Sequence, residues 1–484
     1  MNETVTYLDY AATSPVDPRV AAVMQEALAA GYGNAASAHA AGRAAAQRVA
    51  AARAQVAALV GAAPECIVFT SGATESNNLA ILGIAARADA HAHFVSLRTE
   101  HKSILDPLRE LEKRGARVTW LTPAADGVLD LAALRTALAP GTLLLSMLHA
   151  NNETGVVQDL EPIAALCREL GVLLHVDAAQ SAGKIPLAVG GIDLLSFTAH
   201  KLCGPQGIGA LYVAPHVRPR LQPIVFGGGH ERGLRSGTLP LHQVIGFGTA
   251  CELAAAEGDA DSTRIAGLRD RLLRGLLDLP GALLNGHATR RLPGILNLSF
   301  AGVEGENLFT SLAELAVSTG SACNSASAEP SFVLRALGRK NELAQSSLRY
   351  SFGRFSTQID VDRAIFATRR EILRLRGLSP AEPAPISDWS SEVSVGEAGA
   401  ESTGTWVRWL LLRDADRGVK AARFQLYACP HTQAVCEWLA PQLAGRSFED
   451  LVPGTPQQWA RQGQVPIEKL GRLLVIEDAL RACV

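Results

Sequence analysis

Residues 172–180 have the sequence VLLHVDAAQ, and residues 192–201 have the sequence IDLLSFTAHK. Each begins with an apolar run that is too short for a typical helix but long enough for a strand buried on both faces. Such strands form parallel sheets, whose ligand sites lie at the carboxyl ends of the strands. Asp177 follows the first run and Lys201 follows the second. The two stretches therefore predict a parallel sheet with a polar site at one edge.

A carboxylate and a lysine at neighbouring strand ends suit pyridoxal 5'-phosphate (PLP). The lysine amine binds this cofactor covalently, and the carboxylate pairs with the pyridinium nitrogen. Each unit by which Asp177 raises the pKa of that nitrogen corresponds to about 1.4 kcal/mol of preference for the protonated ring. A lone aspartate after a strand is more often a turn residue, however, and a His-Lys pair is more often on the surface. These two stretches alone leave that alternative open.

Composition limits the class of protein. The chain has 484 residues, 48% of them hydrophobic and 19% charged, which predicts two or three domains. A formal net charge of −2 argues against a nucleic-acid or membrane-surface protein. The eight cysteines include no CxxC pair, which argues against a disulfide framework or a structural zinc site and favours a reducing compartment. With no signal-peptide pattern and no apolar run near 18 residues, we expect a cytoplasmic protein.

Short apolar runs alternate with helical patterns from about Cys66 to Val213, which predicts an α/β fold with a mostly parallel sheet and helices on both faces. The expected strands are Ile67–Phe69, His93–Ser96, Arg117–Leu121, Leu143–Leu148, Val172–Val176, Asp193–Phe197 and Gly209–Val213. Two long helices, Gln243–Glu257 and Ser262–Leu277, open a smaller α+β region. Residues 1–378 are thus expected to form a large domain (about 15–255) and a small domain (the N-terminal segment and about 256–378).

The last hundred residues differ in character. Ser379–Gly404 is rich in Pro, Ala, Ser and Glu and contains no Lys or Arg, which predicts a disordered linker. After it, residues 405–484 are predicted to form a separate α+β module. Its expected elements are the strands Trp406–Leu412 and Phe424–Cys429 and the helices Thr432–Leu443 and Ile467–Ala482.

Polar residues follow three other strands of the predicted sheet. In the first stretch, Phe69–Asn77, the N–H groups of Ala73 and Thr74 are expected at a helix N-terminus, a natural anion site. An ordinary N-cap is the alternative there. His101 and Asn152 follow two further strands and could contact a cofactor or substrate, as could Gln180 beside Asp177, although single residues of these types are more often structural.

A second group of candidates lies in the small domain. Ser318–Ser327 is a polar loop of small residues, and Cys323 within it is not placed like a core thiol, so it suits a mobile nucleophile. Arg349, in the predicted strand Ser347–Ser351, suits a bidentate clamp on a substrate carboxylate, with a surface ion pair as the alternative.

These motifs, in this order and spacing, resemble the NifS/IscS-type cysteine desulfurases, which belong to the class V aminotransferase-like, fold-type I PLP enzymes. The resemblance covers about residues 5–375. The matching segments are Tyr7–Thr13, Thr70–Asn78, Thr99–Lys102, Asn151–Gly155, His175–Gln180, Phe197–Pro205, Gly227–Leu239 and Ser318–Glu329.

The resemblance implies a role for each candidate of the large domain. Lys201 would hold PLP and remove the substrate Cα proton, and Asp177 would pair with the ring nitrogen. His101 would stack on the ring, and Asn152 and Gln180 would contact the substrate and the phenolic oxygen. The residues implied to hold the phosphate are Ala73, Thr74, Thr198, His200 and, from a partner subunit of a homodimer, Thr238.

The resemblance also implies the reaction. Arg349 would bind the carboxylate of L-cysteine, and Cys323 would attack the substrate sulfur to give a persulfide and L-alanine. An iron–sulfur scaffold protein or a thiolation partner would accept the sulfur. Departures from the family pattern at Thr198, Asn324 and Ala35–Ala36 remove no catalytic group. Three alternative functions remain: a selenocysteine lyase, an aminotransferase or a non-enzymatic binding protein.

The C-terminal module bears a weaker resemblance to IscU/NifU-type iron–sulfur scaffolds over about residues 400–484. Of the ligand cysteines of that family, only one is matched, by Cys429. The other ligand positions fall near Thr403 and on Gly471–Arg472. The resemblance therefore implies a degenerate scaffold domain that assembles no cluster.

Overall fold

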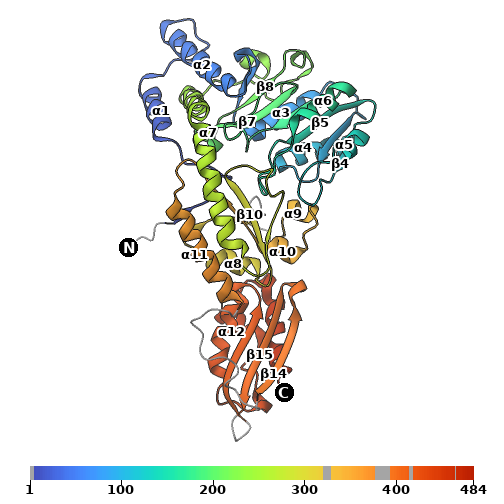
Figure 1. Ribbon diagram of the computed structural model, residues 1–484, viewed down its shortest axis with the longest axis vertical. Coiled ribbons are helices and arrows are strands. Elements are labelled where there is room, and N and C mark those ends of the chain that lie inside the picture. Colours follow the sequence, from blue (N-terminus) through green and yellow to red (C-terminus); the bar gives the residue numbers. More distant parts are fainter. Residues whose placement is uncertain (1–4, 320–328, 377–392, 414–417, 464) are drawn as a thin grey trace.

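The computed structural model describes residues 5–319, 329–376, 393–413, 418–463 and 465–484. It is elongated: an α/β region lies at one end, a smaller α+β region in the middle and a C-terminal region at the other end (Figure 1). Each region has its own large cluster of buried apolar side chains.

The α/β region is built on a seven-stranded sheet with the order β2-β8-β7-β6-β5-β3-β4. The strands are β2 (Ile67–Thr70), β3 (His93–Leu97), β4 (Arg117–Leu121), β5 (Thr142–Leu148), β6 (Leu173–Asp177), β7 (Leu194–Thr198) and β8 (Gly209–Val213). Strands β4, β3, β5, β6 and β7 pair in parallel, and β8 runs antiparallel to both β7 and β2. The predicted mostly parallel sheet is confirmed, with strand ends shifted by at most one residue.

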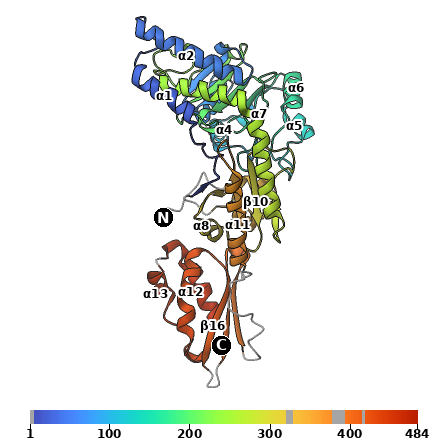
Figure 2. The same ribbon diagram turned by 60° about the vertical axis from the view of Figure 1, so that its left-hand side comes forward.

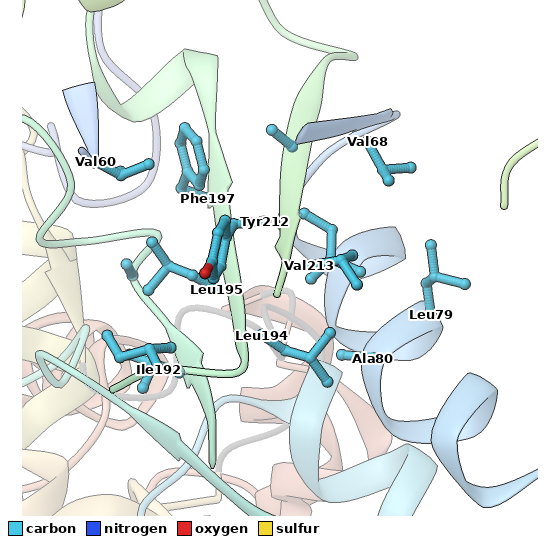
Figure 3. Close-up of a cluster of buried hydrophobic side chains, with 14 of the residues drawn as sticks. Val60, Val68, Leu79, Ala80, Ile192, Leu194, Leu195, Phe197, Tyr212 and Val213 are labelled. Carbon is cyan, nitrogen blue, oxygen red and sulfur yellow. The ribbon is translucent and has the colours of Figure 1, made fainter. Parts of the chain in front are cut away.

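Apolar strands form here because both faces of the sheet are covered. Leu194 and Leu195 of β7 are both fully buried, on opposite faces: Leu194 lies near Ala80, and Leu195 lies beside Tyr212 (Figure 3). Burying each leucine contributes about 1.5–3 kcal/mol. The helices of this region are α1 (Pro18–Ala30), α2 (Ala40–Leu59), α3 (Ala73–Ala85), α4 (Lys102–Lys113), α5 (Leu131–Ala137) and α6 (Leu160–Leu170), and its 3-10 turns are η1 (Pro64–Cys66), η2 (Ala199–Lys201), η3 (Arg218–Arg220) and η4 (Glu231–Gly233).

One helix, α7 (Leu241–Leu277), replaces the two that were predicted. The break expected between Glu257 and Ser262 is wrong, because tertiary contacts stabilise the helix there. Asp261 pairs with Arg354 at 2.8 Å, and the Ser262 hydroxyl donates to the Lys184 carbonyl at 2.6 Å. The helix is about 55 Å long and contributes to the buried clusters of both the α/β and the α+β regions.

The α+β region has a four-stranded sheet with the order β12-β13-β10-β9, and the N-terminal β1 pairs in parallel with β11 beside it. Its strands are β1 (Thr6–Tyr7), β9 (Ala282–Leu284), β10 (Ile295–Phe300), β11 (Leu315–Ala316), β12 (Ser318–Thr319) and β13 (Ser347–Ser351), and its helices are α8 (Gly305–Ser311), α9 (Phe332–Ala336), α10 (Asn341–Gln345) and α11 (Gln358–Leu375). Helix α11 packs against α7 (Figure 1).

The C-terminal region begins earlier than predicted. Residues Val393–Ala400 form strand β14, which pairs antiparallel with β15 (Thr405–Arg413), which in turn pairs with β16 (Val419–Tyr427). The disordered linker predicted for 379–404 is therefore wrong from residue 393 onward. The small residues of this strand allow close packing against α14 (Leu470–Arg481). A Cβ on Gly396 would lie 2.2 Å from the Ala479 carbonyl oxygen, so a larger residue would not fit there.

The helices of this region are α12 (Pro430–Leu443), α13 (Pro456–Gln462) and α14 (Leu470–Arg481), with the 3-10 turns η6 (Glu401–Thr403), η7 (Phe448–Asp450) and η8 (Ile467–Lys469). Two of these three helices, α12 and α14, cover the sheet, α13 packs on them, and α12 contacts the α+β region. Helix α12 lies next to α8 in both views (Figures 1 and 2). Among the described helices, none is both long and apolar enough to cross a membrane.

Candidate active site

Strands β6 and β7 bring the first two candidates together. Asp177 is the last residue of β6, and Lys201 ends the turn η2 that follows β7. The two strands are parallel neighbours, so their carboxyl ends lie side by side. The charge of Lys201 lowers the pKa of Asp177, which also indicates that the two groups are close.

Asp177 is buried, and its carboxylate accepts two short hydrogen bonds. Its Oδ1 accepts from the backbone N–H of Ala179 at 2.8 Å, and its Oδ2 accepts from the Asn77 amide at 2.7 Å. Burial raises the pKa of Asp177, whereas these hydrogen bonds and the nearby His101 and Lys201 lower it. A cationic group placed against this carboxylate would add to the stabilisation of the ionised form.

His101 is held at the start of α4 in a defined tautomer. Its Nδ1 accepts from the backbone N–H of Ser103 at 3.1 Å, so the neutral ring carries its proton on Nε2. Burial lowers the pKa of His101. The Asn77 amide donates both to the Ser103 hydroxyl, at 2.8 Å, and to Asp177. Asn77 and Ser103 thus join two predicted site residues, and the sequence analysis missed both roles.

Lys201 and Gln180 both donate hydrogen bonds to backbone carbonyls of the N-terminal segment. The Lys201 ammonium donates to the carbonyl oxygens of Ala11 and Ala12, and the Gln180 amide donates to that of Ala11 at 2.8 Å. His200 contacts the same segment through Thr13, at 3.2 Å. Burial lowers the pKa of His200 to about 4, so this ring is neutral at pH 7.

The start of α3 lies beside Thr198, as predicted. Gly72 has φ +155° and precedes Ala73, the first residue of α3. A Cβ on Gly72 would lie 3.8 Å from the Thr198 hydroxyl, which is an ordinary contact, so it is the backbone conformation that favours glycine there. A Cβ on Gly209 would lie 2.6 Å from the Gly72 Cα, so a larger residue at position 209 would not fit. Thr74, in the first turn of α3, joins the same end of the sheet. This helix N-terminus can stabilise an anion.

Arg349 is buried beside Asn152. Its side chain is 6% exposed; its Nη1 donates to the Asn152 carbonyl oxygen at 2.9 Å, and its Nη2 donates to Asp9 at 2.7 Å and to the Ser318 hydroxyl at 3.0 Å. The buried Nε–H has no protein partner among the described residues. A substrate carboxylate could satisfy this donor.

Two further predicted site residues differ from the others in what the structure describes. Cys323 lies outside the described residues. Thr238 is exposed in the single chain, after a segment in which Phe226 is also exposed (80%).

The comparisons with known proteins agree with this geometry. The family described as Aminotransferase class-V matches residues 6–364. Cysteine desulfurase IscS of Pectobacterium carotovorum subsp. carotovorum (strain PC1) is 52% identical over 380 residues, covering 77% of this chain and 94% of that protein. A solved NifS-like protein matches with a TM-score of 0.72 at 33% identity, over 78% of this chain and all of that one.

A third protein, solved as SspA in complex with cysteine, matches with a TM-score of 0.65 at 35% identity, over 73% of this chain and all of that one. These matches confirm the expected fold-type I architecture. The chain belongs to the class V aminotransferase family and, within it, to the IscS-type cysteine desulfurases.

Proposed function

We propose that this protein is a PLP-dependent cysteine desulfurase that converts L-cysteine to L-alanine and retains the sulfur as a persulfide on Cys323. The observation that carries the proposal is the convergence of Asp177, His101 and Lys201 at the end of β6 and β7. The buried Nε–H of Arg349, which has no partner among the described residues, suits an amino-acid carboxylate. A cytoplasmic location is part of the proposal.

The residues present fit PLP. The N-terminus of α3, with Ala73, Thr74 and Thr198, suits the phosphate, and His200 lies on the same side. Asp177 suits the ring nitrogen because its carboxylate is buried and already oriented by two N–H donors. When bound, PLP supplies an electron sink for the substrate Cα.

The protein's own groups would then do the following. Arg349 binds the substrate carboxylate and Asn152 orients the substrate, while the Lys201 amine takes the Cα proton. Gln180 serves the phenolic oxygen of the cofactor, and His101, with its proton on Nε2, stacks on the ring and can move a proton. The Cys323 thiolate forms an S–S bond to the substrate sulfur as the substrate C–S bond breaks, and the carbon skeleton leaves as alanine.

The direct test is to supply L-cysteine with a reductant. We expect alanine and sulfide in a ratio of one to one, because the reductant releases the sulfur of each turnover. An aminotransferase would give the keto acid and no sulfide, and a binding protein would give neither product. Preference for selenocysteine over cysteine at equal concentration would favour a selenocysteine lyase instead.

Activity is proposed to require a homodimer. The segment from Gly227 to Thr238 is rich in glycine and exposes the aromatic ring of the preceding Phe226. Exposed apolar side chains in a polar setting are typical of interaction sites. In a C2 dimer, Thr238 of each subunit would reach the phosphate site of the other.

The C-terminal region is proposed to be a degenerate scaffold domain. Support comes from the three antiparallel strands followed by helices, and from the burial of Cys429, Cys436 and Cys483 in its core. Among the described residues, no group of three or more His, Cys, Asp or Glu side chains is placed to hold a metal ion. At a former ligand position, Arg472 supplies a guanidinium, which cannot bind iron.

The part of the C-terminal region next to Cys429 and Arg472 lies against the α+β region. The Asn307 amide donates to the Gln433 amide oxygen at 2.5 Å and to the Ala428 carbonyl at 3.5 Å, and Lys469 pairs with Glu306 at 2.5 Å. These contacts hold the domain against the α+β region of the same chain and support a role that is exercised beside the desulfurase.

Removal of this domain is expected to alter the delivery of sulfur to an acceptor protein and not the conversion of cysteine to alanine. A chain ending at Leu378 should turn over cysteine at the parent rate, because Lys201, Asp177, Arg349 and Cys323 all precede that residue. Persulfide transfer to a separate scaffold protein should change, and the oligomeric state is measured in the same samples by sedimentation. Unchanged transfer and unchanged oligomeric state would indicate a passive domain. Stoichiometric iron and sulfide on the isolated domain would contradict its degenerate character.

A further inference from the structure

Asn77 lies between Asp177 and His101, the two groups proposed to contact the cofactor ring. It is fully buried in the second turn of α3. Its amide nitrogen donates one hydrogen bond to Asp177 Oδ2, at 2.7 Å, and another to the Ser103 hydroxyl, at 2.8 Å. The Ser103 Oγ in turn lies 2.8 Å from His101 Nδ1. One side chain therefore connects both ring-binding groups.

A backbone amide fixes the direction of each hydrogen bond in this chain. The backbone N–H of Ser103 donates to His101 Nδ1 at 3.1 Å, so this nitrogen is an acceptor. The Ser103 hydroxyl then gives its single hydrogen to Nδ1, and its oxygen accepts from Asn77. The second N–H of Asn77 points to Asp177 Oδ2, which is an acceptor as well. The chain thus fits an ionised Asp177 and a neutral His101 with its proton on Nε2.

Asn77 supplies these two donors although its own oxygen lacks a partner. Among the described residues, no donor lies within hydrogen-bond distance of the buried Asn77 Oδ1. An unpaired buried acceptor is unfavourable for folding. Turning the amide over would not help, because Asp177 and the Ser103 oxygen both present acceptors to it. An apolar side chain of similar size would leave no such orphan, so the two N–H donors are what this position provides.

The donor to Asp177 acts against burial. Burial raises the pKa of Asp177, whereas the two N–H donors, His101 and Lys201 lower it. Glu100 is the other buried acid near Asp177, and burial raises its pKa well above the usual value, which favours its neutral form. A buried carboxyl group and a pyridine nitrogen share one proton, and the nitrogen keeps it only where the carboxylate is sufficiently stabilised.

Helix α3 connects the same amide to the proposed phosphate site. Ala73 and Thr74 open α3, and Asn77 follows Ala73 by one helical turn. The helix is held in place by Glu75, which pairs with Arg235 at 2.9 Å. One helix therefore presents its N-terminus to the phosphate and Asn77 to the partner of the ring nitrogen.

We propose that Asn77 is a positioning residue that keeps the shared proton on the nitrogen of the cofactor ring. Its amide stabilises the Asp177 carboxylate, so that the proton stays on the ring, the form in which PLP is the stronger electron sink. Through Ser103 the same amide favours neutral His101 with its proton on Nε2. This inference rests on the proposed function, in which PLP is bound by Lys201 beside Asp177.

The test compares Asn77→Leu with the parent, both as full-length holoenzymes that carry isotope-labelled PLP. Leucine is similar in size to asparagine but has no N–H donor. The NMR shift of the ring nitrogen distinguishes the protonated from the neutral ring. We expect the protonated form in the parent and a shift toward the neutral form in Asn77→Leu. Asn77→Ala, which removes the same donors without filling the space, should show the same shift.

Turnover should follow the position of the proton. In Asn77→Leu we expect kcat for alanine formation to fall about tenfold to a hundredfold, as for loss of a hydrogen bond to a charged group. KM for cysteine should stay within about threefold, because Arg349 is unchanged. Ser103→Ala should keep the parent NMR shift, since Asn77 still donates to Asp177, and should lower kcat about threefold to tenfold. Ser103→Thr retains the hydroxyl and should recover most of that loss.

Asn285→Leu is the matched control. Asn285 is also a buried asparagine whose amide donates to two side-chain oxygens, but these belong to β10 of the small sheet. This variant should retain the parent NMR shift whatever its Tm. A parent-like shift in both Asn77 variants, or an equal shift in Asn285→Leu, would overturn the inference. If the parent protein holds no lysine-bound PLP, the proposed function itself fails.

Discussion

Lys201→Ala is expected to abolish the visible absorbance of lysine-bound PLP and to reduce cysteine turnover by at least about a thousandfold, because the variant loses both the covalent link and the group that removes the Cα proton. The fold should persist. The Lys201 ammonium contacts two backbone carbonyls at the surface of the site, and the apolar side chains around β7 are untouched. The measurements are absorbance spectra of the purified variant and a single-turnover assay for alanine.

Lys102→Ala is the matched control. Lys102 is the first residue of α4 and follows His101 directly, so it is another lysine in the sequence next to a proposed site residue. This variant should retain the absorbance and most of the turnover. If Lys201→Ala keeps the absorbance and Lys102→Ala loses it, the assignment of the cofactor lysine is wrong.

The sequence predicted the large sheet well because its signal is local. Both faces of each strand are covered, so each strand appears in the sequence as a short apolar run between helical patterns, which identifies it. Asp177 and Lys201 then meet because parallel neighbours end at the same edge of the sheet. The proximity of these two residues can therefore be predicted from the order of the strands, without knowing how the side chains are oriented.

The wrong predictions arose where distant contacts decide the local structure. Polar residues between Glu257 and Ser262 suggested a break, but Arg354 and the Lys184 carbonyl hold them in helix α7. The Pro, Ala, Ser and Glu content of residues 379–404 suggested disorder, but the backbone of 393–400 pairs with β15, and its small residues allow α14 to pack closely. Lys184, Arg354 and α14 are all distant in the sequence from the stretches that they hold, although β15 is the next strand after β14.

The finer features of the site were missed for the same reason. Asn77 links Asp177 to Ser103, which holds His101, and these residues come from three different elements. Glu153 reaches Ser331 across 178 positions of the chain. An amide or a carboxylate in a turn gives no sign of such a partner until the fold places it, although both Asn77 and Glu153 lie in stretches that were already singled out.

Cys323→Ala is expected to separate substrate binding from sulfur transfer. Arg349, Asp177 and Lys201 are unchanged, so the variant should bind PLP and should still show the spectral change that cysteine causes in the parent protein. Steady-state alanine and sulfide should fall by at least about a hundredfold, because the nucleophile that accepts the sulfur is absent. Labelled cysteine should leave no reductant-sensitive label on the variant.

Cys66→Ala is the control for this prediction, since burial raises the pKa of the Cys66 thiol and leaves it a poor nucleophile. Its label and turnover should match those of the parent. The same reasoning applies to Cys167, whose pKa burial raises to about 12. A thiol of this kind cannot replace Cys323 at pH 7, because less than about one in ten thousand such groups is ionised. Parent-level turnover in Cys323→Ala would mean that the proposed role of Cys323 is wrong.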